Sequence, residues 1–207
     1  MLAQAFTIGL LMLLSAMLPG PDFALVTKNT VLHSRRAGML TSLGIGCGAL
    51  VHMTYCLLGL AIVISESLLL FSIIKYIGAV YLIYLGINSL LAKHSHVPSS
   101  KSAAKKTAMR DLTAFRQGFL CNLLNPKATL FFLALFTVII RPDTPRAWEL
   151  VYAVEMFLII LAWFGSLTLL LSHPHVMRLL DKAEKYITKV LGVFLVGFGV
   201  ALAFVKR

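Results

Sequence analysis

The stretch MLLSAMLPGPDFALV, residues 12–26, decides the fold, because it breaks the helix that the surrounding apolar residues favour. Proline has no amide hydrogen and disfavours helix in the residue before it, while glycine adds backbone freedom, so Pro19-Gly20-Pro21 opens the hydrogen-bond ladder. A second apolar run carries a milder break, LLNPK, at residues 123–127. A shift of 105 residues superimposes the two breaks and places Asp22 opposite Lys127. This pattern predicts two related halves, each with one broken helix.

The composition places both breaks in a membrane protein. Of the 207 residues, 59% are apolar and 13% are charged, whereas soluble domains average about 45–50% and about 25%. One helical crossing of the bilayer needs about 20 residues. Apolar stretches of this order cover residues 2–18, 38–64, 68–91, 112–140, 147–171 and 186–205. We therefore expect an all-α polytopic protein with six transmembrane helices, arranged as two inverted three-helix repeats.

The net charge is +11, and the Lys and Arg residues that produce it are concentrated in particular loops. Ten Lys and Arg residues follow the first, third and fifth apolar stretches, and four lie on the other side. The positive-inside rule then places the three basic loops in the cytoplasm and both termini outside. Residues 93–111 are predicted to be a basic cytoplasmic linker between a first repeat, 1–92, and a second, 112–207. We attribute the linker's charge to topology and to contact with membrane lipids, and not to nucleic-acid binding.

The two breaks also predict the binding site. Unpaired backbone groups at membrane depth are tolerated only where they line a protected or water-filled cavity, and the start of a half-helix suits a carboxylate. Ionisable groups within a span cost at least about 2.5–3.5 kcal/mol, so Asp22 and Lys127 are expected to form a central ion pair or to share the substrate's amino and carboxylate groups. The alternative is a pair that only locks the two halves together. The predicted substrate-binding residues are Pro19, Gly20, Pro21, Asp22, Asn125, Pro126 and Lys127.

Three residues are candidates for proton coupling. A carboxylic acid in a low-dielectric site holds its proton more readily, so Asp22 or Glu155 could load and release one. Glu155 could instead be a solvated residue near the outer interface. His52 lies on a glycine-rich face of the second apolar stretch, where a hydrogen-bonded packing histidine is the alternative. Glycine faces of this kind also favour helix packing or a homodimer.

Motifs of other protein classes are missing from the sequence. It has no nucleophile elbow, metalloprotease helix motif or Walker loop, which argues against an enzyme and against an ATP-driven pump. We expect no cofactor. Two His-x-His pairs, His94/His96 and His173/His175, lack nearby cysteines or paired carboxylates, so they are interpreted as loop histidines and no metal site is assigned.

Pro19 to Asp22 (PGPD), Arg36-Ala37-Gly38 and the stretch GFLCNLLNPKA at 118–128 resemble the LysE/RhtB family of amino-acid exporters over nearly the whole chain. The segment from Glu155 to Trp163 looks most like the threonine exporter branch. The resemblance implies a secondary transporter of the bacterial inner membrane. It would export small neutral amino acids such as threonine or homoserine in antiport with protons. Heavy-metal efflux, with the histidine pairs as the feature to test, and a non-transporting membrane scaffold are the alternatives.

Overall fold

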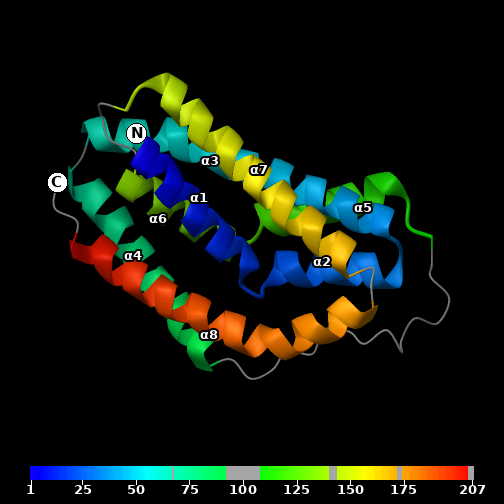
Figure 1. Ribbon diagram of the computed structural model, residues 1–207. Helices are drawn as coiled ribbons and strands as arrows, with labels where there is room; N and C mark the ends of the chain where they lie inside the picture. The colour runs from blue at the N-terminus through cyan, green and yellow to red at the C-terminus, as the bar shows by residue number, and fades with distance from the viewer. Residues whose placement is uncertain (67, 92–107, 140–143, 172–173, 205–207) are drawn as a thin grey trace.

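The computed structural model describes residues 1–66, 68–91, 108–139, 144–171 and 174–204, and in these ranges all regular structure is helical. The predicted all-α class is therefore confirmed. The helices, drawn in Figure 1, are α1 (Leu2–Met17), α2 (Pro21–Leu32), α3 (Arg35–Glu66), α4 (Leu68–Leu91), α5 (Asp111–Leu123), α6 (Pro126–Ile139), α7 (Arg146–Leu170) and α8 (Pro174–Phe204).

Both predicted breaks are present. The axes of α1 and α2 meet at 60°, and those of α5 and α6 meet at 56°. At the first break the backbone of Gly20 is extended, and Pro21 is the first residue of α2, where a helix needs no amide hydrogen. At the second break α5 ends at Leu123 and Pro126 begins α6. The prolines thus end one half-helix and start the next, as their chemistry requires.

Length and composition allow two to four membrane spans in the described residues. Residues Arg35–Leu58 of α3 and Arg146–Leu170 of α7 each qualify alone, and each bent pair qualifies when it is taken as one span. Within α4 and α8 the apolar segments that the structure describes are Lys75–Leu91 and Thr188–Ala201. The described helices do not confirm the six-span repeat architecture, which stays a prediction. Residues 93–107 of the predicted linker lie outside the described residues.

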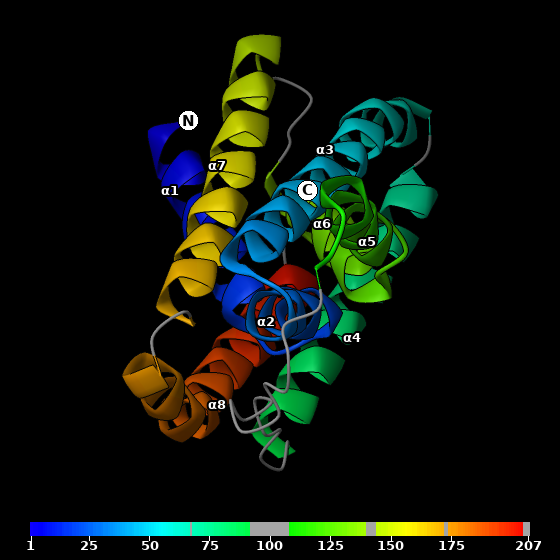
Figure 2. The same ribbon diagram turned by 90° about the vertical axis from the view of Figure 1, so that its right-hand side faces the viewer.

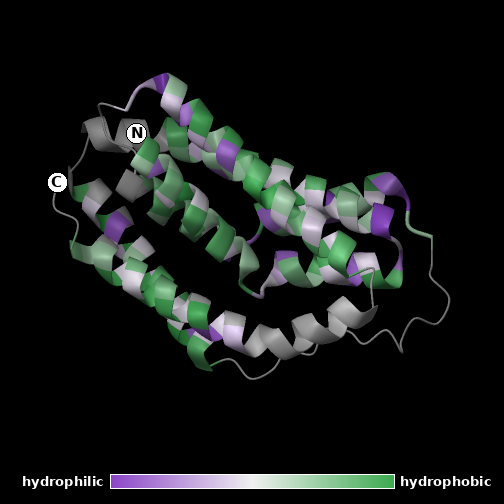
Figure 3. Cartoon of the chain, in the orientation of Figure 1, coloured by the Kyte–Doolittle hydropathy of each residue, from purple (hydrophilic) through white to green (hydrophobic). Residues whose placement is uncertain are grey.

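The chain ends and the basic turns lie at opposite ends of the bundle. In Figure 1 the start of α1 and the end of α8 are on the left, while the α2–α3 turn, the start of α5 and the end of α7 are on the right. This arrangement agrees with the predicted placement of both termini on one side of the membrane. Figure 3 shows apolar residues covering most of the helices, and Phe6, Val80 and Leu150 are more than half exposed. Outward-facing apolar side chains of this kind suit a lipid environment.

Helix α3 packs closely on α5, and α8 packs on α4 (Figures 1 and 2). A Cβ atom on Gly118 of α5 would collide with the backbone of Thr41, and one on Gly44 of α3 would collide with the carbonyl of Phe115. The two backbones approach this closely only because both positions are glycine. This contact brings the middle of α3 against the α5–α6 break.

Candidate functional site

A cavity of about 40 Å³ lies where the two breaks meet. One water needs about 10–15 Å³ on this scale, so the cavity has room for more than a single water. Its polar side includes Ser15, Asp22, Asn122, Asn125 and Lys127. Its apolar side includes Met12, Ile45, Phe131, Phe132, Ile160 and Phe164. A cavity with one polar and one apolar side suits a small amphipathic ligand.

Asp22 lies in the first turn of α2, where the helix dipole favours a negative charge. Its Oδ2 accepts hydrogen bonds from Nδ2 of Asn122 (2.9 Å) and from Nδ2 of Asn125 (3.2 Å). Its Oδ1 is buried and has no hydrogen-bond partner among the described residues. The thiol of Cys121, a weak donor, also neighbours the carboxylate. One oxygen of Asp22 is therefore fixed by the opposite break, and the other is an open acceptor.

Lys127 lies in the first turn of α6, and its side chain crosses to the first break. Its Nζ donates to the carbonyl oxygens of Ser15 (3.1 Å) and Leu18 (3.2 Å) at the end of α1. In a continuous helix the Ser15 carbonyl would accept from residue 19, but Pro19 has no N–H. The ammonium therefore takes the place of a missing backbone donor at the negative end of a helix dipole.

The predicted direct ion pair between Asp22 and Lys127 is not formed. Both residues are within the described ranges. The carboxylate of Asp22 bonds to the α5–α6 break, and the ammonium of Lys127 bonds to the end of α1, so the two charged groups do not bond to each other. The physical reason is that the break leaves the carbonyls of Ser15 and Leu18 without their usual helical donors, and both accept hydrogen bonds from Nζ of Lys127. The two other predictions, shared binding of substrate groups and a lock between the halves, remain open.

The other predicted binding residues divide into two groups. Gly20, Pro21 and Asn125 line the cavity together with the two charged residues. Asn125 also caps α6, because its Oδ1 accepts from the backbone N–H of Lys127 (3.0 Å). Pro19 and Pro126 do not line the cavity and act through the backbone.

Sequence reasoning missed Asn122 and Ser15. A usable signal was present, because Ser15 and Asn122 each stand four residues before a break proline, so each has a carbonyl without its usual helical donor.

His52 is buried (1% exposed) against the second break. Its Nε2 lies 3.0 Å from the carbonyl oxygen of Asn122, and its Nδ1 faces the hydroxyl of Tyr55. The imidazole stacks on Phe132, with 5.5 Å between the ring centroids. His52 does not line the cavity, although Asn122 and Phe132 do. Both of its nitrogens are engaged, which agrees with the hydrogen-bonded alternative.

Glu155 lies away from the cavity, in the contact between α7 and α1. A Cβ atom added to Gly9 of α1 would be 2.6 Å from its Oε1, so the carboxylate rests directly against the α1 backbone. Its Oε2 is buried without a hydrogen-bond partner among the described residues. This is not the environment of a solvated surface acid. It is a place where the charge of one carboxylate can alter the contact between two helices.

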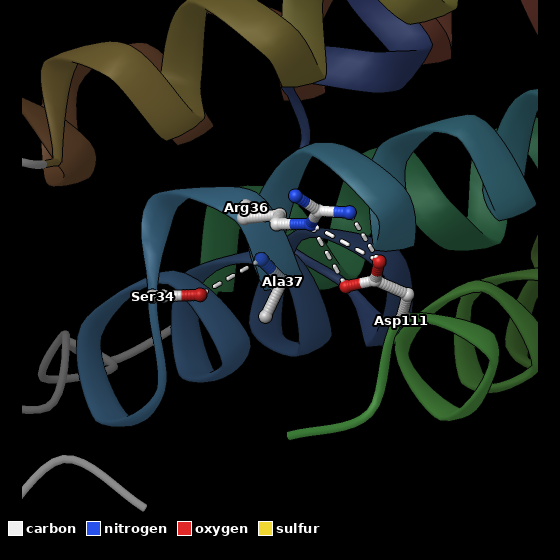
Figure 4. A network of polar contacts seen from close by, with 4 residues as sticks. All are labelled: Ser34, Arg36, Ala37 and Asp111. Atoms are coloured by element: carbon white, nitrogen blue, oxygen red, sulfur yellow. Dashed lines mark hydrogen bonds and ion pairs between the residues drawn. The ribbon is translucent and has the colours of Figure 1, made fainter. Parts of the chain in front are cut away.

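Polar contacts link the starts of α3 and α5 (Figure 4). The guanidinium of Arg36, at the start of α3, holds the carboxylate of Asp111, at the start of α5, through both oxygens. Ser34 caps α3 by accepting from the backbone N–H of Ala37. Deeper in the bundle, the buried side-chain amide of Asn29 in α2 donates to Thr41 (2.9 Å) and to Gln117 (3.0 Å).

The described residues contain no group of three or more His, Cys, Asp or Glu side chains that could hold a metal ion. His94, His96 and His173 lie outside the described residues, as does the side chain of His175. Nothing in the described part of the chain therefore favours metal efflux over amino-acid efflux.

Comparison with known proteins gives a consistent assignment. The LysE type translocator family matches residues 13–205. A threonine efflux protein of Salmonella typhi is 31% identical over 202 residues, 98% of each chain. A leucine efflux protein of Salmonella choleraesuis is 30% identical over 190 residues, 90% of this chain and 88% of that protein. An uncharacterized membrane protein of Bacillus subtilis is 34% identical over 189 residues, 88% of this chain and 90% of that protein. No solved structure matches the chain. The chain is a multi-pass membrane protein and belongs to the family of LysE type translocators.

Proposed function

We propose that this protein exports small neutral amino acids across the bacterial inner membrane, with threonine and homoserine as the first candidates. The observation that carries the proposal is the open Oδ1 of Asp22 beside a cavity between two broken helices. A buried carboxylate oxygen without a donor is costly, and the ammonium group of an amino acid would supply that donor. The relatives named as threonine and leucine efflux proteins support the same class of substrate.

Lys127 supplies the matching group for the substrate carboxylate. A lysine ammonium has three N–H donors, and two of them go to the carbonyls of Ser15 and Leu18. The third is available to a ligand in the cavity. With the ammonium at Asp22 and the carboxylate toward Lys127, the substrate's side chain would rest against the apolar side formed by Phe131, Phe132 and Ile160.

Proton coupling follows from competition at Asp22. A proton and a substrate ammonium bind the same carboxylate oxygen, so each excludes the other. Protonation from the outer side would release the amino acid there, and loss of the proton to the cytoplasm would prepare the site for the next one. Glu155 is the second candidate carrier, because its carboxylate lies between α1 and α7 and its charge would change how those helices pack.

The transport cycle is proposed to be alternating access between two inverted three-helix repeats that form six spans. Rocking of one repeat against the other around a fixed central site is the motion that such architectures use. A homodimer packed through glycine faces is compatible with this cycle.

The test is uptake of radiolabelled threonine, homoserine and leucine into proteoliposomes under an imposed pH gradient. We expect uptake that an uncoupler abolishes. Asp22→Asn should remove it, while Asp111→Asn, a matched change at a half-exposed carboxylate outside the cavity, should retain it. Gradient-independent uptake would refute the coupling, and equal activity of the two variants would refute the site. Metal-ion flux without amino-acid flux would favour the metal alternative, and no flux of either kind would favour a scaffold.

A further inference from the structure

The α5–α6 break leaves a backbone carbonyl without its usual helical donor. Asn122 stands four residues before Pro126, so its carbonyl oxygen would accept the N–H of residue 126 in a continuous helix, and proline has none. The N–H of Asn125 turns back to this oxygen at 3.0 Å. Asn122 is nevertheless buried (4% exposed), and a carbonyl oxygen has a second lone pair. Within the bilayer, water does not reach such a group.

His52 supplies that donor from α3. Its Nε2 is 3.0 Å from the Asn122 oxygen, and because a carbonyl only accepts, the proton must be on Nε2. Its Nδ1 faces the hydroxyl of Tyr55, which has a proton to donate. Both contacts are satisfied by one neutral tautomer, with hydrogen on Nε2 and a lone pair on Nδ1. Among the described residues, the groups that contact His52 are Tyr55 of α3, Asn122 of α5 and Phe132 of α6, and of these three the phenol of Tyr55 is titratable.

The same asparagine holds the proposed binding carboxylate. The side-chain Nδ2 of Asn122 donates to Oδ2 of Asp22 at 2.9 Å, while its backbone oxygen is held by His52. Asn122 also packs against Gly48, one turn before His52 in α3, where a Cβ atom would be 3.0 Å from its side chain. Helix α3 thus fixes both the backbone and the side-chain direction of the residue that orients Asp22.

The first break is built in the same way. Pro19 leaves the Ser15 carbonyl without its helical donor, and Lys127 Nζ bonds to that oxygen at 3.1 Å. For Pro19 and for Pro126, the carbonyl four residues earlier thus contacts a donor side chain from another helix. The same kind of contact at both breaks indicates that these hydrogen bonds contribute to the structure of the site.

We propose that His52 is a positioning residue, whose Nε2–H group fixes the Asn122 carbonyl so that Asp22 keeps one oxygen bound and one open for the substrate. The role rests on the proposed function, because it acts through the site to which we assign the substrate. It distinguishes His52 from the proposed proton carriers, because both of its ring nitrogens contact protein groups and it does not line the cavity.

The test compares His52→Gln, whose amide can still donate, with His52→Leu, which cannot. Loss of one buried donor corresponds to about a tenfold rise in KM for the transported amino acid in His52→Leu. His52→Gln should restore KM to within about threefold and should leave the pH profile of transport unchanged. His33→Leu, at the end of α2, is the matched histidine control and should behave as the wild type.

A second measurement does not require transport. Nitrogen NMR of histidine-labelled wild-type protein, with His52 assigned by its absence in His52→Gln, should show hydrogen on Nε2 of His52. Hydrogen on Nδ1 alone, or a shifted pH profile in His52→Gln, would overturn the positioning role, as would wild-type KM in His52→Leu. Absence of transport in the wild type would instead count against the proposed function, and the NMR result would still decide the state of His52.

Discussion

Replacing Gly118 by alanine should separate α3 from α5 and weaken the site that their contact supports. The added Cβ atom would meet the carbonyl oxygen, the carbonyl carbon and the Cα atom of Thr41. These are backbone atoms, so no side-chain rotation relieves the collision, and the helices must part by about 1 Å. Thr41 is fully buried and accepts from the Asn29 amide, which resists that movement.

The size of the effect follows from two opposing contributions. Overpacking costs about 1–3 kcal/mol, and a collision with backbone belongs at the upper end. Alanine is better than glycine in a helix by about 1 kcal/mol, so the net loss in free energy of unfolding is about 2 kcal/mol. Gly197→Ala is the matched control, because nothing lies within 4 Å of its added Cβ atom. That variant should gain about 1 kcal/mol, and the difference of about 3 kcal/mol isolates the collision.

Unfolding of the purified protein in detergent is monitored by far-UV circular dichroism, which reports the helix content. Transport is measured in proteoliposomes. Gly118→Ala should unfold more easily than the wild type and should show a higher KM, because Asn122 lies one turn further along α5 and moves with it. Equal stability of Gly118→Ala and Gly197→Ala would refute the close approach of α3 and α5. Lower stability with an unchanged KM would refute the link between that contact and the binding site.

Three further outcomes are expected. Arg36→Ala removes an exposed ion pair, and exposed ion pairs contribute little to stability, so the unfolding midpoint and the transport rate should both stay close to wild type in the assays above. Glu155→Gln should keep substrate counterflow but lose uptake driven by the pH gradient if Glu155 carries the proton, and retention of both would assign the proton to Asp22. Phe132→Ala removes the ring beneath His52 and part of the apolar side of the cavity, so it should destabilise the protein by about 3–5 kcal/mol and reduce leucine uptake more than threonine uptake.

The breaks could be predicted from the sequence because they depend on local chemistry. A proline lacks its amide hydrogen in every fold, so Pro19-Gly20-Pro21 and Asn125-Pro126 end helices whatever surrounds them. The apolar composition is also independent of how the helices pack, and it predicts contact with lipid.

The contacts across the site could not be predicted, because they depend on how distant segments pack. Asp22 and Asn122 are 100 residues apart and meet only because α3 holds α5 against the first break. Asp22 and Lys127 each follow the proline that begins a half-helix, as the shift of 105 residues predicts, but equivalence by repeat gives a position and not a side-chain direction. The direct ion pair, one of two arrangements expected from the sequence, is not formed, because Nζ of Lys127 donates to carbonyl oxygens at the end of α1.

The crossed contacts also make the two breaks depend on each other. Asp22 begins α2 but is held by amides of the α5–α6 break, and Lys127 begins α6 but holds the end of α1. A proton or an ammonium group that binds Asp22 changes the charge to which Asn122 and Asn125 donate. Asn125 also caps α6 by accepting a hydrogen bond from the backbone N–H of Lys127. A change at Asn125 therefore reaches Lys127, whose ammonium group bonds to α1. Under the proposed function, binding at one half-helix would therefore alter the support of the other, which is the coupling that the proposed exchange of substrate for protons requires.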